Sequence, residues 1–383
     1  MKTKINHILP VLLLTAASGL TTVSCNDFLD KTPDNRTELN TDQKIAKLLV
    51  SAYPDVSPNE LFELYSDNSD DSGPTYGYYQ LSEKECYNWE DTKEEYQDTP
   101  NSLWGGYYGA ISAANMALKA IEEKGNPASL NPQRGEALVC RAYCHFMLAT
   151  IFCNAYDTHA SESLGIPYME DVETTVSPRY ERGTLEEVYR KVERDLLEGV
   201  ELISDDGYSV PKYHFTRKAA YAFAARFYLY YMKPDFSNCD RVIDFATRVL
   251  GTNPADLLRN WEALGNLSVN GNVQADAYIA SSNEANLLIS STVSNWGAIG
   301  SDYLIGPRYF HNQTLATSET CLSSGLWGSS DYFYLKPFST NGFVASILRK
   351  SGLYEGTYLY YMPVLFSTDE TLLCRAEAYA LKK

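Results

Sequence analysis

Apolar residues recur every three or four positions along most of this chain, which is the spacing of one face of an α-helix. The pattern is strongest in five segments: residues 102–123, 135–156, 184–203, 216–232 and 240–250. It also marks a first helix between Asn40 and Pro54, and it returns from Asp369 to Lys383. Segment 135–156 is apolar almost all round, so we expect that helix to be buried. The sequence therefore predicts an all-α fold.

Three of the predicted helices share a local pattern that indicates an internal repeat. Each places Ala beside Arg ahead of aromatic residues, in GEALVCRAYCHFMLA, RKAAYAFAARFYLYY and DETLLCRAEAYALKK. Thr184 and Glu187 have the spacing of a capping box at the start of one helix. We expect the four helices from Leu103 to Met232 to form two antiparallel pairs, and the next helix to begin a third. This organisation resembles tetratricopeptide-type helical hairpin repeats.

Two regions lack the helical pattern. Residues from about 55 to 100 are acidic and aromatic, and Gly, Ser, Asn and aromatic residues dominate from about 253 to 363. Long irregular regions inside a compact domain are usually functional. We therefore expect the repeats to support an irregular, loop-rich ligand face within a domain that spans residues 40–383.

The first 24 residues have the layout of a secretory signal peptide. Lys2 and Lys4 precede an apolar stretch that is too short to span a bilayer comfortably, and small and hydroxyl residues follow. No later stretch of at least 18 apolar residues is present. The sequence therefore predicts a signal peptide over residues 1–24.

Cys25 follows the small residue Ser24, in a context that resembles a relaxed bacterial lipobox. We predict that Cys25 is the lipidated N-terminus of the mature protein and that residues 25–39 form a polar tether. Several acyl chains would hold the protein on a membrane nearly irreversibly, since each buried CH₂ contributes about 0.8 kcal/mol. Ordinary cleavage, with Cys25 left as a free thiol, is the alternative.

The charge of the chain argues against nucleic acid as a partner. The net charge is −17 and the pI is near 4.8, whereas phosphate binding requires clustered Lys and Arg. The chain also contains 30 Tyr and 5 Trp, and tyrosine combines an apolar ring with a polar tip that suits wet binding surfaces. Trp104 and Tyr107, however, lie on a predicted helix, and we expect them to be core residues.

The cysteines do not indicate a metal centre. Eight are present, and setting Cys25 aside leaves seven, an odd number that cannot all pair within one chain. Cys140 and Cys144 share one helical face and could be ligands, a bridge or small core residues, of which the last is favoured. We predict no bound metal and no cofactor.

The sequence carries no recognisable catalytic motif. It has no G-x-S-x-G elbow, H-E-x-x-H helix or phosphate-binding loop. Glycoside hydrolysis needs two carboxylates at a fixed separation, but among 49 acidic residues a chance pair carries no information. We predict that the protein is not an enzyme.

Exposed aromatic residues on loops are candidates for stacking against the apolar faces of sugar rings. The following aromatic residues lie in Gly- and Ser-rich sequence with little helical periodicity: Trp296, Tyr303, Tyr309, Trp327 and Tyr332. We expect at least two of them to form a stacking platform.

The acidic stretch DNSDDSG invites a calcium interpretation, with Asp67, Ser69 and Asp71 at alternate positions. The sixth and twelfth positions of a calcium loop, where Gly and Glu are expected, hold Ser72 and Tyr78 instead. A solvated turn or polar contacts to sugar hydroxyls are the other readings.

Four stretches together resemble the SusD/RagB family of outer-membrane nutrient-binding lipoproteins. They are CNDFLDKTP, the first helix pair (YGAISAANMALKAIEE and GEALVCRAYCHFMLATIFCNAY), the second (RGTLEEVYRKVERDLLEGVELI with KAAYAFAARFYLYY), and MPVLFSTDETLLCRAEAYALKK. The resemblance runs from Cys25 onward. Family members continue past the last stretch, so we expect this chain to be truncated at its carboxy terminus.

The resemblance implies a cell-surface lipoprotein at the outer membrane that binds a glycan or oligosaccharide and passes it to a TonB-dependent SusC-like transporter, without catalysis. It places ligand contacts in the early loop, where the candidates are Asp67, Asn68, Tyr76 and Trp89. The alternative is a helical-repeat adaptor of an outer-membrane complex without its own glycan site. Such an adaptor needs no aromatic-rich loops far from its groove.

Overall fold

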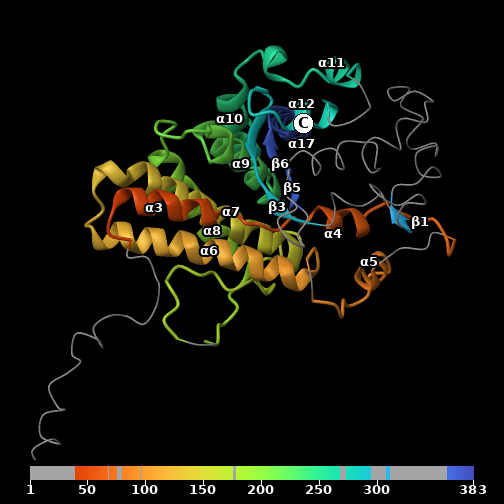
Figure 1. The fold of residues 1–383 in the computed structure, drawn as a ribbon, viewed down its shortest axis with the longest axis horizontal. Helices are drawn as coiled ribbons and strands as arrows, with labels where there is room; N and C mark the ends of the chain where they lie inside the picture. The colour runs from red at the N-terminus through yellow and green to blue at the C-terminus, as the bar shows by residue number, and fades with distance from the viewer. Residues whose placement is uncertain are drawn as a thin grey trace, which may run out of the picture. The chain divides into compact units, whose positions relative to one another are not determined.

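Helices dominate the described part of the chain, and the long ones lie where the hydrophobic spacing predicts them (Figure 1). They are α3 (Asp42–Leu49), α6 (Pro100–Glu123), α7 (Asn131–Phe152), α8 (Leu185–Leu202), α9 (Arg217–Tyr230), α10 (Cys239–Leu250) and α17 (Thr368–Leu381). The predicted all-α fold is therefore confirmed.

The computed structural model describes residues 39–67, 69–75, 80–95, 97–175, 178–267, 273–294, 308–310 and 360–383. Thr41–Lys383 forms one unit by its internal contacts, and Met1–Asn40 forms another. The predicted signal peptide and Cys25 lie outside the described residues. Among the residues described, no helix is both long and apolar enough to cross a membrane.

Side-chain caps start several of the long helices where the sequence changes from loop to helix. The Thr99 hydroxyl accepts a hydrogen bond from the Ser102 amide at 3.4 Å, and Pro100 occupies the first turn of α6. The predicted capping box of α8 is confirmed: the Glu187 amide donates to Thr184 Oγ1 at 3.2 Å, and the Thr184 amide donates to Glu187 Oε2 at 3.0 Å.

Helix α7 is the most enclosed helix of the described chain. It packs between α6 and α8 and also contacts α3 and α9. Cys140 and Cys144 are buried free thiols on this helix, which confirms that they are core residues. Because α7 is covered on several sides, its nearly uniform apolar sequence is explained.

Helix α8 packs mainly against α7, and α9 packs mainly against α10, so the predicted pairing of α8 with α9 is the smaller contact. The contact between α7 and α8 includes a close approach of two glycines. A Cβ atom on Gly135 of α7 would lie 2.8 Å from the carbonyl oxygen of Gly199 of α8. The absence of both side chains lets the two backbones meet.

Short helices and strand pairs occupy the described parts of the two regions that lack helical periodicity. The helices are α4 (Asn59–Leu64), α5 (Leu81–Tyr87), α11 (Trp261–Gly265) and α12 (Val273–Ile279), with a 3₁₀ turn at Ala255–Leu257. Elsewhere in the described chain, 3₁₀ turns cover Val50–Ala52, Ala128–Leu130 and Pro211–Tyr213. Three antiparallel pairs form: β1 (Asp70–Asp71) with β4 (Tyr309–Phe310), β2 (Asn286–Ile289) with β6 (Val364–Ser367), and β3 (Thr292–Val293) with β5 (Tyr360–Tyr361). Two to four residues are too few to show a strand period in the sequence.

An aromatic cluster joins the helices to β6. Phe366 of β6 lies 5.8 Å from the ring of Tyr143 on α7 and 5.8 Å from that of Phe223 on α9. Arg226 of α9 lies over the Phe366 ring at 4.0 Å and donates to the Glu370 carboxylate of α17 at 2.6 Å. Arg226 therefore connects β6 and α17 to helix α9 of the repeats.

Candidate functional site

The most exposed aromatic surface of the described early loop consists of Tyr65 and Trp89. Tyr65 ends α4 and Trp89 follows α5, and their ring centroids are 4.7 Å apart with an interplanar angle of 50°. Trp89 is 73% exposed. We call these two residues the aromatic platform. A large ring that is left in water, yet supported from one side by another ring, is available to stack against a ligand.

The backbone at Trp89 is strained. Its φ is +59°, in the left-handed region that non-glycine residues seldom adopt. The turn persists because the Trp89 amide donates to the Cys86 carbonyl at 2.9 Å and the Glu90 amide donates to the Glu85 carbonyl at 2.8 Å. Strain of this kind costs about 1–3 kcal/mol and is concentrated at ligand-binding positions.

The chain beyond Trp89 is fixed by the buried carboxylate of Glu85. This carboxylate accepts one hydrogen bond from the Lys93 amide and one from the Lys93 ammonium, each at 2.9 Å. These contacts fold residues 90–93 back against α5. The position of the indole is therefore set by α5 and its turn rather than by the indole's own contacts alone.

The early and late irregular regions meet at β1 and β4. Arg308 donates to both carboxylate oxygens of Asp71, at 2.6 and 2.7 Å, and the Gly73 amide donates to Asp71 Oδ1 at 2.8 Å. The hydrogen bond from Arg308 lowers the pKa of Asp71. Strand β4 also contacts α4 and α5, so all four elements belong to one face (Figure 1).

Tyr309 lies within this face but is only 4% exposed. Its ring packs against Tyr87 of α5 with centroids 4.8 Å apart, and the Arg308 guanidinium lies 5.2 Å from the ring centre. In this arrangement Tyr309 supports the face and offers little ring surface to a ligand.

The other sequence candidates divide into two groups. Asp67 is exposed and follows α4, two residues after Tyr65. The following candidates lie outside the described residues: Asn68, Tyr76, Trp296, Tyr303, Trp327 and Tyr332. Tyr65 was not predicted from the sequence, because the short helix α4 that presents it was not predicted.

The calcium interpretation loses one of its ligands in the structure. Both carboxylate oxygens of Asp71 are engaged by Arg308, whose positive charge opposes a cation at the same place. Within the described ranges, no group of three or more His, Cys, Asp or Glu is arranged to hold a metal ion.

The early irregular region contains three buried carboxyl groups, on Glu60 of α4, Glu83 of α5 and Asp98 just before α6. Burial raises the pKa of Glu60 well above its ordinary value, and the charges of Asp98 and Glu83 add to this. Burial also raises the pKa of Glu83, from 4.5 to about 7. Glu60 and Glu83 therefore favour their protonated forms, because charges are costly to bury.

We expect the Glu83→Gln variant to gain stability relative to wild type as the pH rises. A carboxyl with a raised folded-state pKa contributes stability below its unfolded pKa near 4.5, and this contribution is lost as the pH rises through about 7. The unfolding free energy of Glu83→Gln minus that of wild type should therefore grow by on the order of 2 kcal/mol between pH 5 and pH 8. Urea denaturation at several pH values measures it.

The difference between the two proteins is needed because His145 acts in the opposite direction. Burial lowers the pKa of His145 to about 3, so its contribution to stability is lost as the pH falls below about 6.5. Since His145 is present in both proteins, its contribution cancels in the difference between their unfolding free energies. A difference that stays constant with pH would show that Glu83 is ionised throughout.

The sequence and the fold both resemble those of known proteins. A SusD-like family described as starch-binding and associating with the outer membrane has a sequence profile that matches residues 27–229. No curated protein matches the sequence significantly.

Several solved structures share the fold. A SusD superfamily protein from Bacteroides fragilis aligns with a TM-score of 0.61 and 17% identity, over 90% of this chain and 76% of that one. A SusD-like carbohydrate binding protein from Bacteroides vulgatus aligns with a TM-score of 0.60 and 16% identity, over 89% and 71%. Surface glycan-binding protein A from Bacteroides uniformis aligns with a TM-score of 0.59 and 15% identity, over 88% and 76%.

Proposed function

Since the chain belongs to the SusD-like family of starch-binding proteins that associate with the outer membrane, we propose that it captures a glycan on its aromatic platform, Tyr65 and Trp89. The observation that carries this proposal is the exposed, supported indole of Trp89 on the loop-rich face. Sugar rings present apolar C–H faces that lie on aromatic planes, and the indole offers such a plane.

Polar groups near the platform would complete the recognition of a sugar. Asp67 is exposed close to Tyr65 in sequence, and its carboxylate can accept hydrogen bonds from hydroxyl groups. Binding is noncovalent, and no catalytic step is proposed. An aromatic surface with a few polar groups at its edge is the usual composition of small-ligand sites.

Delivery to a SusC-like TonB-dependent transporter is the second part of the proposal. A lipid anchor at Cys25 and a tether over residues 25–39 would keep the protein at the cell surface. Anchoring beside a transporter raises the effective concentration of the captured ligand at the pore, so a weak individual site suffices.

The adaptor function is the competing proposal, and the position of Trp89 disfavours it. An adaptor that binds through its helical repeats gains nothing from a strained, exposed tryptophan on the loop face. The sign of the net charge does not discriminate between the two functions.

We expect the Trp89→Asn variant to lose glycan binding by about tenfold or more, because it removes the stacking surface. Asparagine tolerates the left-handed backbone conformation, so the variant relieves strain instead of adding it. Isothermal titration of the full chain against starch-derived and host-derived polysaccharides measures the effect.

Trp261→Ala is the matched control, since Trp261 is also exposed, at 56%, but lies on α11. Equal losses in both variants would contradict the assignment of the platform. If the folded protein shows no heat with any polysaccharide, the adaptor function replaces glycan capture.

A further inference from the structure

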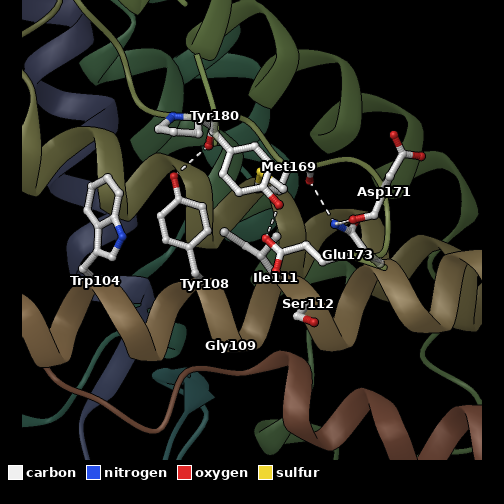
Figure 2. Close-up of a pocket in the computed structure, with 11 residues that line it drawn as sticks. Trp104, Tyr108, Gly109, Ile111, Ser112, Met169, Asp171, Glu173 and Tyr180 are labelled. Carbon is white, nitrogen blue, oxygen red and sulfur yellow. Dashed lines mark hydrogen bonds between the residues drawn. The ribbon is translucent and has the colours of Figure 1, made fainter. Parts of the chain in front are cut away.

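A second aromatic site lies on the helical part of the molecule, between α6 and the segment that follows α7. It is a cavity of about 400 Å³. Figure 2 shows Trp104 and Tyr108 rising side by side from α6, with Tyr180 and Glu173 facing them from the segment after α7. None of the residues of the aromatic platform lines this cavity. Trp104, expected to be a core residue, is partly exposed here, whereas Tyr107 is buried as predicted.

The wall opposite α6 is held in place by side chains of the repeat helices. The Tyr108 hydroxyl donates to the Pro167 carbonyl at 2.7 Å. The Asn115 amide group donates to the carbonyls of Met169 and Asp171, at 3.1 and 3.3 Å. The cavity is therefore formed before any ligand arrives, which lowers the entropic cost of binding.

The buried side chain of His145 on α7 also holds the segment after α7 in place. The Met169 amide donates to Nε2 of His145 at 2.9 Å, so Nδ1 carries the proton and donates to the Arg141 carbonyl at 2.9 Å. Burial lowers the pKa of His145 to about 3, so the ring stays neutral and Nε2 remains an acceptor at physiological pH.

Aromatic side chains form part of the cavity wall. The Trp104 and Tyr108 centroids are 4.9 Å apart with an interplanar angle of 52°, and Phe152 supports Trp104 edge-on at 5.0 Å. Tyr180 is 43% exposed, and its hydroxyl donates to the Glu173 carboxylate. Three aromatic rings thus border one space from two sides.

The charged residues that line the cavity are acidic. Among the described residues that line it, Asp171 and Glu173 are the charged ones, both are exposed, and none is Lys, Arg or His. In the adjoining cleft, Arg141 pairs with Asp195 at 2.6 Å and Arg194 pairs with Glu170 at 2.7 Å. Arg182, whose charge acts on the Tyr108 hydroxyl, donates to the Gly165 carbonyl at 2.6 Å. The faces of the aromatic rings and the Glu173 carboxylate beside them both attract positive charge.

We propose that this cavity binds an organic cation, an ammonium or guanidinium group on an apolar stem. The stem packs against Trp104 and Tyr108, and the charge is stabilised by the ring faces and by the Glu173 carboxylate, which lies beside the rings (Figure 2). A free amine or a Lys or Arg side chain of a partner polypeptide would supply this group. A neutral sugar would leave the Glu173 carboxylate without a counter-charge.

Titration of the full chain with pairs of cationic and neutral probes tests the proposal. The probes are choline with its neutral isostere 3,3-dimethylbutanol, and acetyl-lysine methylamide with acetyl-norleucine methylamide. We expect saturable binding of the cations and none of the neutral partners. Choline binding identifies a free organic cation as a source, and binding of the lysine derivative alone identifies a polypeptide side chain.

Glu173→Gln is the informative variant, because glutamine still accepts the hydrogen bond from Tyr180 and only the charge is lost. We expect it to weaken cation binding about fivefold. Glu181→Gln removes the same charge from the same segment outside the cavity and should leave binding unchanged, as should Trp89→Asn. Equal binding of neutral probes, displacement by maltooligosaccharides, or equal losses in Glu173→Gln and Glu181→Gln would overturn the proposal.

Discussion

Replacing Asp195 by alanine is expected to lower the free energy of unfolding by about 3–5 kcal/mol, because it leaves a buried guanidinium without its counter-charge. Arg141 of α7 donates to Asp195 of α8 at 2.6 Å, and the two side chains are 8% and 1% exposed. The Tyr168 hydroxyl donates to the same carboxylate at 2.7 Å. Removing the carboxylate therefore disturbs α7, α8 and the segment that forms one wall of the second cavity.

Glu198→Ala provides the matched control, one turn further along α8. Its carboxylate pairs with Arg134, but both side chains are one-third or more exposed to solvent. Exposed pairs contribute little, so we expect a loss below about 1 kcal/mol. Urea denaturation monitored by circular dichroism compares the variants. Similar losses at both positions would show that Arg141 finds another partner or water when Asp195 is absent.

Replacing Gly135 by alanine is expected to cost about 3 kcal/mol, because the added methyl group meets backbone rather than a movable side chain. The new Cβ would lie 2.6 Å from the Ile203 amide nitrogen and 2.8 Å from the Gly199 carbonyl oxygen. Backbone atoms cannot rotate away, so α7 and α8 must separate. The contact between these helices is the most extensive of the described chain.

Gly105→Ala on α6 distinguishes this steric effect from helix propensity. A Cβ atom at Gly105 meets nothing within 4 Å, so alanine should stabilise the helix by about 0.5–1 kcal/mol. Opposite signs for the two substitutions are the expected outcome in thermal or urea denaturation. A stabilising effect at Gly135 would show that the helices have room to move apart without loss.

The long helices could be predicted because their signals are local. Apolar spacing defines α6 and α7, and the Thr184–Glu187 capping box fixes the start of α8. The strands could not be predicted in this way. Residues such as Asp71 become a strand only through a partner in another region, and nothing in their own sequence indicates pairing.

The site was predicted less completely, because periodicity shows which face a residue occupies but not what covers that face. Trp104 shares the periodic helix of Tyr107, yet the neighbouring segment leaves its ring on a cavity. Tyr309 lies in a Gly- and Ser-rich context typical of exposed loops, yet Tyr87 and Arg308 cover it. Trp89 stays a prediction as a ligand contact, and its exposure makes it the first residue to test.

The bridge between Asp71 and Arg308 also has a consequence for the order of folding. Its two residues are 237 positions apart, whereas α6 and α7 are neighbours along the chain. Closing so long a loop is entropically costly, and local contacts form faster. During synthesis from the N-terminus, the helices up to α10 can pack before Arg308 has been made. We therefore expect the newly made protein to acquire its helical scaffold first and the face formed by β1 and β4 last.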